Sequence, residues 1–116
     1  MQAAASLAEV ARRAEIVFLC LPGEPQVRAV CLGGGAGEGL AALVKSGQTV
    51  VDMSTCPVAL ARELGQAFGA RGIAFADAPI ARTAQAARDG TLSIMIGARR
   101  RSSRGSAHSW GAWVRR

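Results

Sequence analysis

The sequence lacks any long apolar segment. Its longest uninterrupted apolar run, Ile16 to Leu21, is far shorter than the ~20 residues that a membrane-spanning helix needs. The first residues, Met1-Gln2-Ala3, also lack the basic cluster and long apolar stretch of a secretory signal. We therefore expect no membrane association and a cytoplasmic location.

Histidine and paired cysteines are equally scarce. The single histidine, His108, stands in a basic C-terminal segment, which argues against histidine-based catalysis. The three cysteines, Cys20, Cys31 and Cys56, are odd in number and have no Cys-x-x-Cys spacing, so they indicate neither a disulfide framework nor a metal site. Their apolar surroundings predict buried, reduced thiols.

Excess charge is absent from most of the chain. The net charge is +6, but residues 1–98 hold as many acidic as basic side chains, and the excess arginines all lie in residues 99–116. We expect a neutral domain over residues 1–97 and a basic, disordered tail over residues 98–116. The tail's mixture of Arg, Ser and Trp is also typical of a coding frame read out of register. A non-catalytic module whose tail binds nucleic acid or acidic partners is the alternative function, although the neutral domain makes nucleic acid the less favoured partner.

Short apolar segments alternate with amphipathic ones along residues 2–97. This alternation predicts right-handed βαβ units and a mainly parallel sheet, hence an α/β, partial Rossmann-like fold. The helix over residues 57–70 is expected to bury six apolar residues: Val58, Leu60, Ala61, Leu64, Ala67 and Phe68. The expected strands are residues 15–21, 49–52, 73–75 and 91–96, and the expected helices are residues 2–13, 38–44, 57–70, 84–88 and one that begins at Pro25.

A glycine-rich run over residues 33–39 invites interpretation as a phosphate-binding loop. The Gly-x-Gly-x-x-Gly spacing fails, because Glu38 and Leu40 stand where the third glycine is needed. The run also follows a predicted helix rather than a strand. A solvated, flexible linker is the better prediction.

Three loops follow the expected strands at the edge where ligands of open α/β sheets bind. They begin at Leu21-Pro22, Asp52-Met53 and Asp77-Ala78. Ser54 and Thr55 in the second loop either cap the next helix or line a crevice. Arg82 in the third either holds an anionic ligand or is a solvated surface residue. Lys45 precedes a strand, at the opposite edge, and is therefore a poor candidate for proton transfer.

Four segments together resemble the β-hydroxyacid dehydrogenases, which include 3-hydroxyisobutyrate dehydrogenase and tartronate semialdehyde reductase and share the NAD(P)-binding domain of 6-phosphogluconate dehydrogenase. The segments are residues 17–22, 50–55, 77–80 and 90–97. The resemblance implies NAD or NADP as cofactor, contacted by Leu21, Pro22, Gln26 and Thr55. It also implies that Ala81, Arg82 and Thr83, which replace the family's usual Ser-Gly-Gly, contact the substrate. The Arg-Thr pair resembles a variant in some sulfolactaldehyde reductases of the family, so a small anionic aldehyde or hydroxy acid is expected.

The same resemblance implies missing parts. The family's glycine-rich dinucleotide loop lies upstream of Glu15, and its catalytic lysine lies beyond Gly97 in a helical domain that also forms the dimer interface. None of these has a counterpart here, so we expect a fragment truncated at both ends, with no catalytic residue, no family-type dimer interface and no activity of its own. The strand over residues 15–21 would then be an exposed apolar edge.

Overall fold

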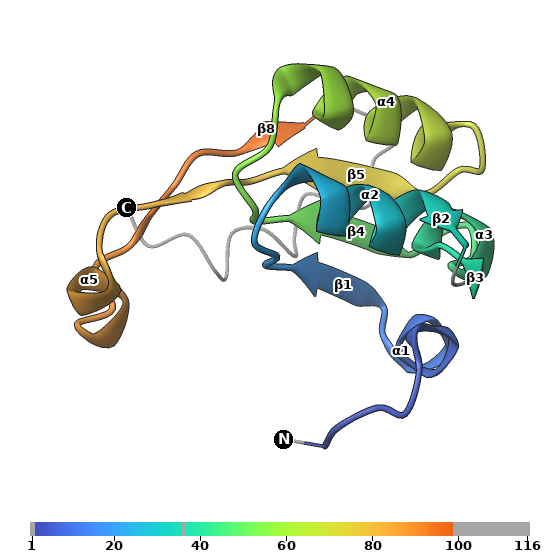
Figure 1. Cartoon of the computed structure of the whole chain (residues 1–116), viewed down its shortest axis with the longest axis horizontal. Coiled ribbons are helices and arrows are strands. Elements are labelled where there is room, and N and C mark those ends of the chain that lie inside the picture. Colours follow the sequence, from blue (N-terminus) through green and yellow to red (C-terminus); the bar gives the residue numbers. More distant parts are fainter. Residues whose placement is uncertain (1, 36, 99–116) are drawn as a thin grey trace.

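A four-stranded, mainly parallel sheet forms the centre of the molecule (Figure 1). The computed structural model describes residues 2–35 and 37–98. The strands lie in the order β1 (Ile16–Leu19), β4 (Thr49–Asp52), β5 (Ala74–Asp77) and β8 (Gly97–Ala98). The first three are parallel to one another, and β8 pairs antiparallel with β5. The predicted α/β, Rossmann-like architecture is confirmed.

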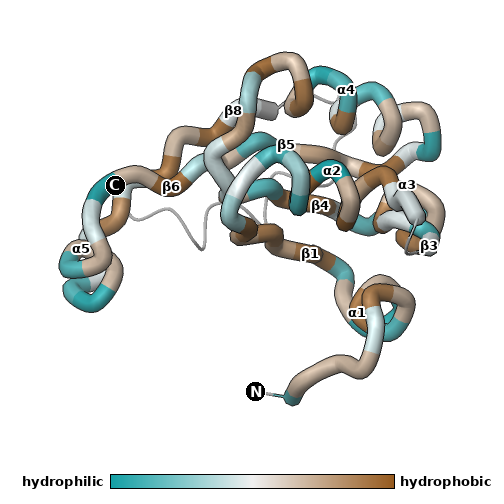
Figure 2. The backbone as a smooth tube through the Cα atoms, in the orientation of Figure 1, coloured by the Kyte–Doolittle hydropathy of each residue, from teal (hydrophilic) through white to brown (hydrophobic). Residues whose placement is uncertain are grey.

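Two helices, α2 (Glu24–Leu32) and α4 (Val58–Gly69), lie over the same face of the sheet, as Figure 1 shows. Their inward positions pack against the β1 side chains Val17 and Leu19, which are buried, whereas Phe18 between them is 52% exposed. This alternation follows from the two-residue period of a strand. Figure 2 shows β1 as apolar along its length, so one apolar side chain of the strand meets solvent.

The long helix α4 packs as its apolar spacing predicts, with one exception. Leu60, Leu64 and Phe68 are fully buried, and the Phe68 ring stacks on Phe75 of β5 with centroids 5.5 Å apart. The predicted burial of Val58 is wrong, because this residue is 66% exposed. It occupies the first turn of the helix, where the chain has only just reached the sheet.

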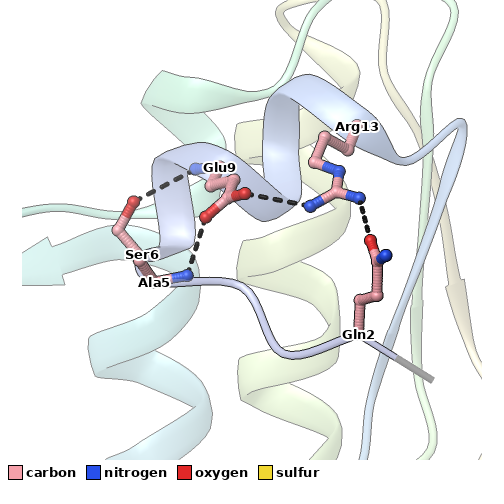
Figure 3. Close-up of polar contacts among 5 residues, drawn as sticks. All are labelled: Gln2, Ala5, Ser6, Glu9 and Arg13. Atoms are coloured by element: carbon pink, nitrogen blue, oxygen red, sulfur yellow. Dashed lines mark hydrogen bonds and ion pairs between the residues drawn. The ribbon is translucent and has the colours of Figure 1, made fainter.

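The first helix, α1 (Leu7–Arg13), is shorter than predicted because capping fixes its start at Ser6 (Figure 3). The Ser6 hydroxyl accepts a hydrogen bond from the Glu9 N–H, and a Glu9 carboxylate oxygen accepts one from the Ala5 N–H at 2.7 Å. The Arg13 guanidinium joins this cluster by donating hydrogen bonds to the Glu9 carboxylate and to the side-chain oxygen of Gln2. The Ser6–Glu9 bond satisfies an N–H group of the first turn that helix geometry leaves unpaired, and the other contacts tie residues 2–5 to the helix.

The glycine-rich run is not the flexible linker that its composition predicts. Gly33–Gly34 (β2) and Gly37–Glu38 (β3) form a small antiparallel pair between α2 and the four-residue helix α3 (Leu40–Leu43). The φ of +83° at Gly33 lies in the left-handed region, where glycine has no steric penalty. Glycine content here allows a tight reversal rather than a loose connection.

The strand predicted over residues 91–96 is divided in the structure. Ser93–Ile94 (β7) pairs antiparallel with Ile80–Ala81 (β6), around the short helix α5 (Ala84–Arg88), before the chain returns to the main sheet as β8. Ile94, Met95 and Ile96 are each more than 40% exposed. Their apolar side chains predict a core strand, but the strand pairing in the structure leaves them exposed.

The predicted division of the chain between residues 97 and 98 falls inside β8 and stays a prediction. The rest of the predicted tail, with both interpretations of it, lies outside the described residues. Within residues 2–35 and 37–98, no helix has the length and apolar character that crossing a membrane requires.

Candidate functional site

Backbone hydrogen bonds tie together the three loops that follow β1, β4 and β5. Because these strands are parallel, their carboxyl ends lie at one edge of the sheet. The Met53 N–H donates to the Leu19 carbonyl at 2.8 Å, and the Ala78 N–H donates to the Asp52 carbonyl at 2.7 Å. The Ile80 N–H reaches the Met53 carbonyl at 3.4 Å. The structure therefore brings the three predicted loops together.

Ser54 adds a side-chain contact to this edge. Its hydroxyl oxygen accepts a hydrogen bond from the Leu21 N–H at 3.0 Å, and its own N–H donates to an Asp52 carboxylate oxygen at 2.9 Å. Ser54 is 3% exposed and Asp52 is 2% exposed. The prediction that Ser54 or Thr55 caps α4 is wrong, because the cap position is Pro57 and no side chain bonds there.

The residues predicted to contact a dinucleotide surround the turn from β1 into α2. Leu21 is half-buried, while Pro22 and Gln26 are exposed at the start of α2. Thr55, in the neighbouring loop, is exposed one residue after the buried Ser54. Gln26 and Thr55 therefore offer an exposed amide and an exposed hydroxyl in the two segments that flank the Leu21–Ser54 bond.

The residues predicted to contact a substrate lie between β6 and α5. Ala81 ends β6, and Arg82 follows it with an exposed side chain and a φ of +95°, which L-residues rarely adopt. The Thr83 hydroxyl oxygen accepts a hydrogen bond from the Ala86 N–H at 3.3 Å, so Thr83 is the cap of α5. Thr83 therefore has a structural role whether or not it meets a ligand.

Two carboxylates lie side by side on neighbouring strands, where β4 and β5 end. Asp52 and Asp77 are register partners in β4 and β5, so their side chains lie on the same face. Partial burial raises the pKa of Asp77 above its ordinary value, and the nearby Asp52 carboxylate raises it further. This part of the edge is electronegative.

The three cysteines differ from one another more than predicted. Cys31 is fully buried, and burial raises its pKa to about 12, which makes its thiol unreactive. Cys56 is half-buried, and its pKa is raised by burial and by the carboxylates of Asp52 and Asp77. Cys20 is exposed, so the prediction of burial is wrong for that residue. By the two-residue period of a strand, Cys20 follows Phe18 on the exposed face, while Val17 and Leu19 face the core.

Metal ligands do not converge in the described part of the chain: no group of three or more His, Cys, Asp or Glu side chains could hold an ion there. Lys45 is exposed and precedes β4, so it lies at the edge of the sheet opposite the three loops. The predicted position of Lys45 is confirmed, and its lack of a part in proton transfer stays a prediction.

A family model described as the NAD binding domain of 6-phosphogluconate dehydrogenase matches residues 1–108. The chain belongs to this family. Mitochondrial 3-hydroxyisobutyrate dehydrogenase from Mus musculus is 36% identical over 96 residues, covering 83% of this chain and 28% of that protein. The 2-hydroxy-3-oxopropionate reductase of Escherichia coli strain K12 is 33% identical over 89 residues, covering 77% and 30% respectively.

Solved structures of similar proteins share the fold. Psf3, in complex with NADP+ and 2-OPP, superposes with a TM-score of 0.75 at 28% identity over 83% of this chain and 33% of its own. The 3-hydroxyisobutyrate dehydrogenase of Mycobacterium tuberculosis, with L-serine, gives a TM-score of 0.69 at 28% identity over 80% and 30%. This chain thus spans about a third of the length of the relatives that it matches.

Sequence reasoning located the loops of this NAD-binding domain but missed the contact between Ser54 and Leu21. The two residues are 33 positions apart, so no local pattern connects them. The signal that was present is the spacing of Asp52 and Ser54, because an aspartate commonly bonds the backbone two residues onward.

Proposed function

We propose that the edge formed by the loops after β1, β4 and β5 is the nicotinamide side of an NAD(P) site, in a dehydrogenase of small hydroxy acids or semialdehydes. The observation that carries the proposal is the junction of these loops through Met53, Ser54 and Ala78 at the carboxyl ends of parallel strands. Family membership and a relative in complex with NADP+ support it.

Leu21 and Pro22 provide the rigid wall of the proposed site. The Leu21 N–H donates a hydrogen bond to the Ser54 hydroxyl, and the ring of Pro22 fixes the φ of Pro22 itself. Gln26 and Thr55 have exposed amide and hydroxyl groups with which they could bind the ribose and nicotinamide amide. A bound nicotinamide would supply or accept the hydride.

Arg82 is the proposed anion-binding residue for the substrate. Its planar guanidinium pairs with a carboxylate, sulfonate or phosphonate through two parallel hydrogen bonds. The flanking Ala81 and Thr83 fix its place between β6 and α5. Two of the relatives are named for small carboxylates, 3-hydroxyisobutyrate and 2-hydroxy-3-oxopropionate, which fits a substrate of this charge.

This polypeptide by itself is proposed to bind the dinucleotide weakly and to turn over no substrate. Hydride transfer to or from a hydroxy acid needs a proton donor or acceptor beside the reacting carbon. Lys45, the single lysine of the sequence, lies at the far edge of the sheet. The sequence also offers no Gly-x-Gly-x-x-Gly loop for the pyrophosphate.

An NMR titration tests the proposal. The 15N-labelled chain is titrated with NADPH, NADH and reduced nicotinamide mononucleotide, and the amide shifts are followed. We expect saturable shifts at Leu21, Gln26 and Thr55, of similar strength for the mononucleotide, and none at Ser46 on the opposite edge. Shifts confined to other regions, or saturation at micromolar NADPH, would contradict the proposed location or the proposed weak binding.

A second titration tests residues 81–83, which we call the substrate loop. With NADPH present, 3-hydroxyisobutyrate is expected to shift the amides of Ala81, Arg82 and Thr83, and the uncharged amide of the same acid is expected not to. Arg82→Gln removes the charge and should abolish the response. An Arg82→Gln variant that responds like the original chain would show that the anion binds elsewhere.

A further inference from the structure

One side chain stands out among the contacts that join the three strand-end loops. The bonds from Met53 to Leu19, from Ala78 to Asp52 and from Ile80 to Met53 run between backbone groups, which every non-proline residue has. The bond from the Leu21 N–H to the Ser54 hydroxyl depends on residue type. Residue 54 is therefore a point where the amino-acid sequence, rather than the backbone alone, controls the geometry of this edge.

We propose that Ser54 is a positioning residue of the site, whose buried hydroxyl holds the Leu21–Pro22 turn against the loop after β4. The backbone at Ser54 is held in turn by Asp52, because the Ser54 N–H donates a hydrogen bond to the Asp52 carboxylate two residues earlier. Both residues are almost completely buried, so water has little access to replace either bond.

The position of Ser54 also links the two halves of the proposed site. On one side, the Ser54 hydroxyl holds the turn assigned to the dinucleotide. On the other side, the carbonyls of Asp52 and Met53 accept hydrogen bonds from Ala78 and Ile80, which lead to the segment assigned to the substrate. Loss of the hydroxyl leaves the Leu21 N–H without its acceptor and frees the turn to move. The expected effect on dinucleotide affinity rests on the proposed function, whereas the effect on Leu21 does not.

Amide exchange in the free protein tests the contact itself. Leu21 exchange is measured by NMR in the full chain, in Ser54→Ala, and in Ser54→Thr, which keeps a hydroxyl. Ser46→Ala is the matched control, because the Ser46 hydroxyl contacts the Gly72 carbonyl at the opposite edge. We expect Leu21 to exchange about fivefold faster or more in Ser54→Ala, with Ser54→Thr and Ser46→Ala close to the original chain.

Three outcomes would overturn the proposal: unchanged Leu21 exchange in Ser54→Ala, an equal increase at all amides of β4, or no recovery in Ser54→Thr. If Ser54→Ala does not fold, Ser54→Cys takes its place. Its thiol is a weaker acceptor and should give an intermediate exchange rate at Leu21; a rate equal to that of the original chain would count against the proposal.

Titration of the same proteins with NADPH separates this inference from the proposed function. We expect the Kd for NADPH to rise about fivefold in Ser54→Ala and to recover in Ser54→Thr. If Leu21 exchange rises while the Kd stays constant, the positioning role is wrong. If the original chain gives no NADPH response at all, the proposed function fails, and the exchange result still decides whether Ser54 holds the turn.

Discussion

Arg82 holds a backbone conformation that costs free energy for any residue with a Cβ. Its φ of +95° is outside the range that L-residues readily adopt, and such conformations cost of the order of 1–3 kcal/mol. Strain of this kind persists where the surrounding structure or a function requires it. The strain at Arg82 therefore marks the turn from β6 into α5 as a candidate functional feature.

Arg82→Gly should relieve this strain and is expected to be more stable than Arg82→Ala by about 1 kcal/mol, because alanine keeps the Cβ while both variants lose the charge. Urea unfolding of the two variants measures the difference directly. Equal stabilities would show that the backbone at residue 82 relaxes in solution. Both variants should lose the response to the anionic substrate.

Asp77 should make the stability of the chain depend on pH. Burial and the Asp52 carboxylate raise its folded-state pKa above the unfolded value, so the folded state binds the proton more tightly. The stabilising contribution is complete below the unfolded pKa of about 4 and is lost as the pH rises through the folded pKa.

The variant Asp77→Asn removes this titration. We expect its melting temperature relative to the original chain to increase as the pH is raised from 3 to 7, as measured by calorimetry at matched ionic strength. Asp89→Asn is the control, since Asp89 is exposed at the C-terminal cap of α5. A constant difference between Asp77→Asn and the original chain would contradict the raised pKa.

At the scale of elements, the connection from α2 to α3 depends on a close approach of backbone at Gly39. A Cβ at this position would lie 2.3 Å from the Gly33 nitrogen and 2.5 Å from the Cys31 carbonyl oxygen, so the backbone would have to move. Gly34 in the same hairpin has no atom within 4 Å of an added Cβ. Gly39→Ala is therefore expected to destabilise the chain by about 1–3 kcal/mol.

The matched variant Gly34→Ala should change the free energy of unfolding by less than about 0.5 kcal/mol. Chemical denaturation of both variants measures the contrast. If both variants lose a similar, large part of the free energy of unfolding, the connection is sensitive to any added side chain. If both change it little, the backbone around Gly39 moves to accept a Cβ without a cost in stability.

Elements whose residues bury one face were predictable, and elements defined by contacts with distant residues were not. The apolar strands around Val17, Val50 and Ala76 follow from local pattern, because a buried parallel strand is apolar along its length. The division of residues 91–96 into β7 and the return to β8 depends on pairing with Ile80 and Asp77, and no local pattern encodes that choice. The start of α1 at Ser6 had a local signal in the spacing of Ser6 and Glu9.

For the molecule as a whole, the sequence predicted that the three loops share one edge of the sheet, because parallel strands all end there. It did not predict how the loops are held. That depends on Ser54 meeting Leu21 across 33 residues and on Asp52 lying beside Asp77 in register, both of which need the strand order and alignment.

Strand β1 lies at one edge of the four-stranded sheet. Among the residues that the structure describes, β1 pairs with β4 alone, and its segment Ile16–Leu19 carries neither charge nor proline to discourage a further strand. Phe18, 52% exposed, adds apolar surface beside this edge. We therefore expect the chain to self-associate as its concentration rises.

Phe18→Lys should suppress this self-association while preserving the fold, because a charge on an edge strand disfavours pairing and the lysine stem still covers the neighbouring apolar surface. Val58→Lys makes the same change of charge outside the sheet, at the start of α4, where residue 58 is 66% exposed. Sedimentation velocity over a concentration series should show Phe18→Lys as monomer and Val58→Lys associating like the original chain. Equal suppression in both variants would assign the effect to net charge, and a monomeric original chain would show that the β1 edge does not attract a second copy.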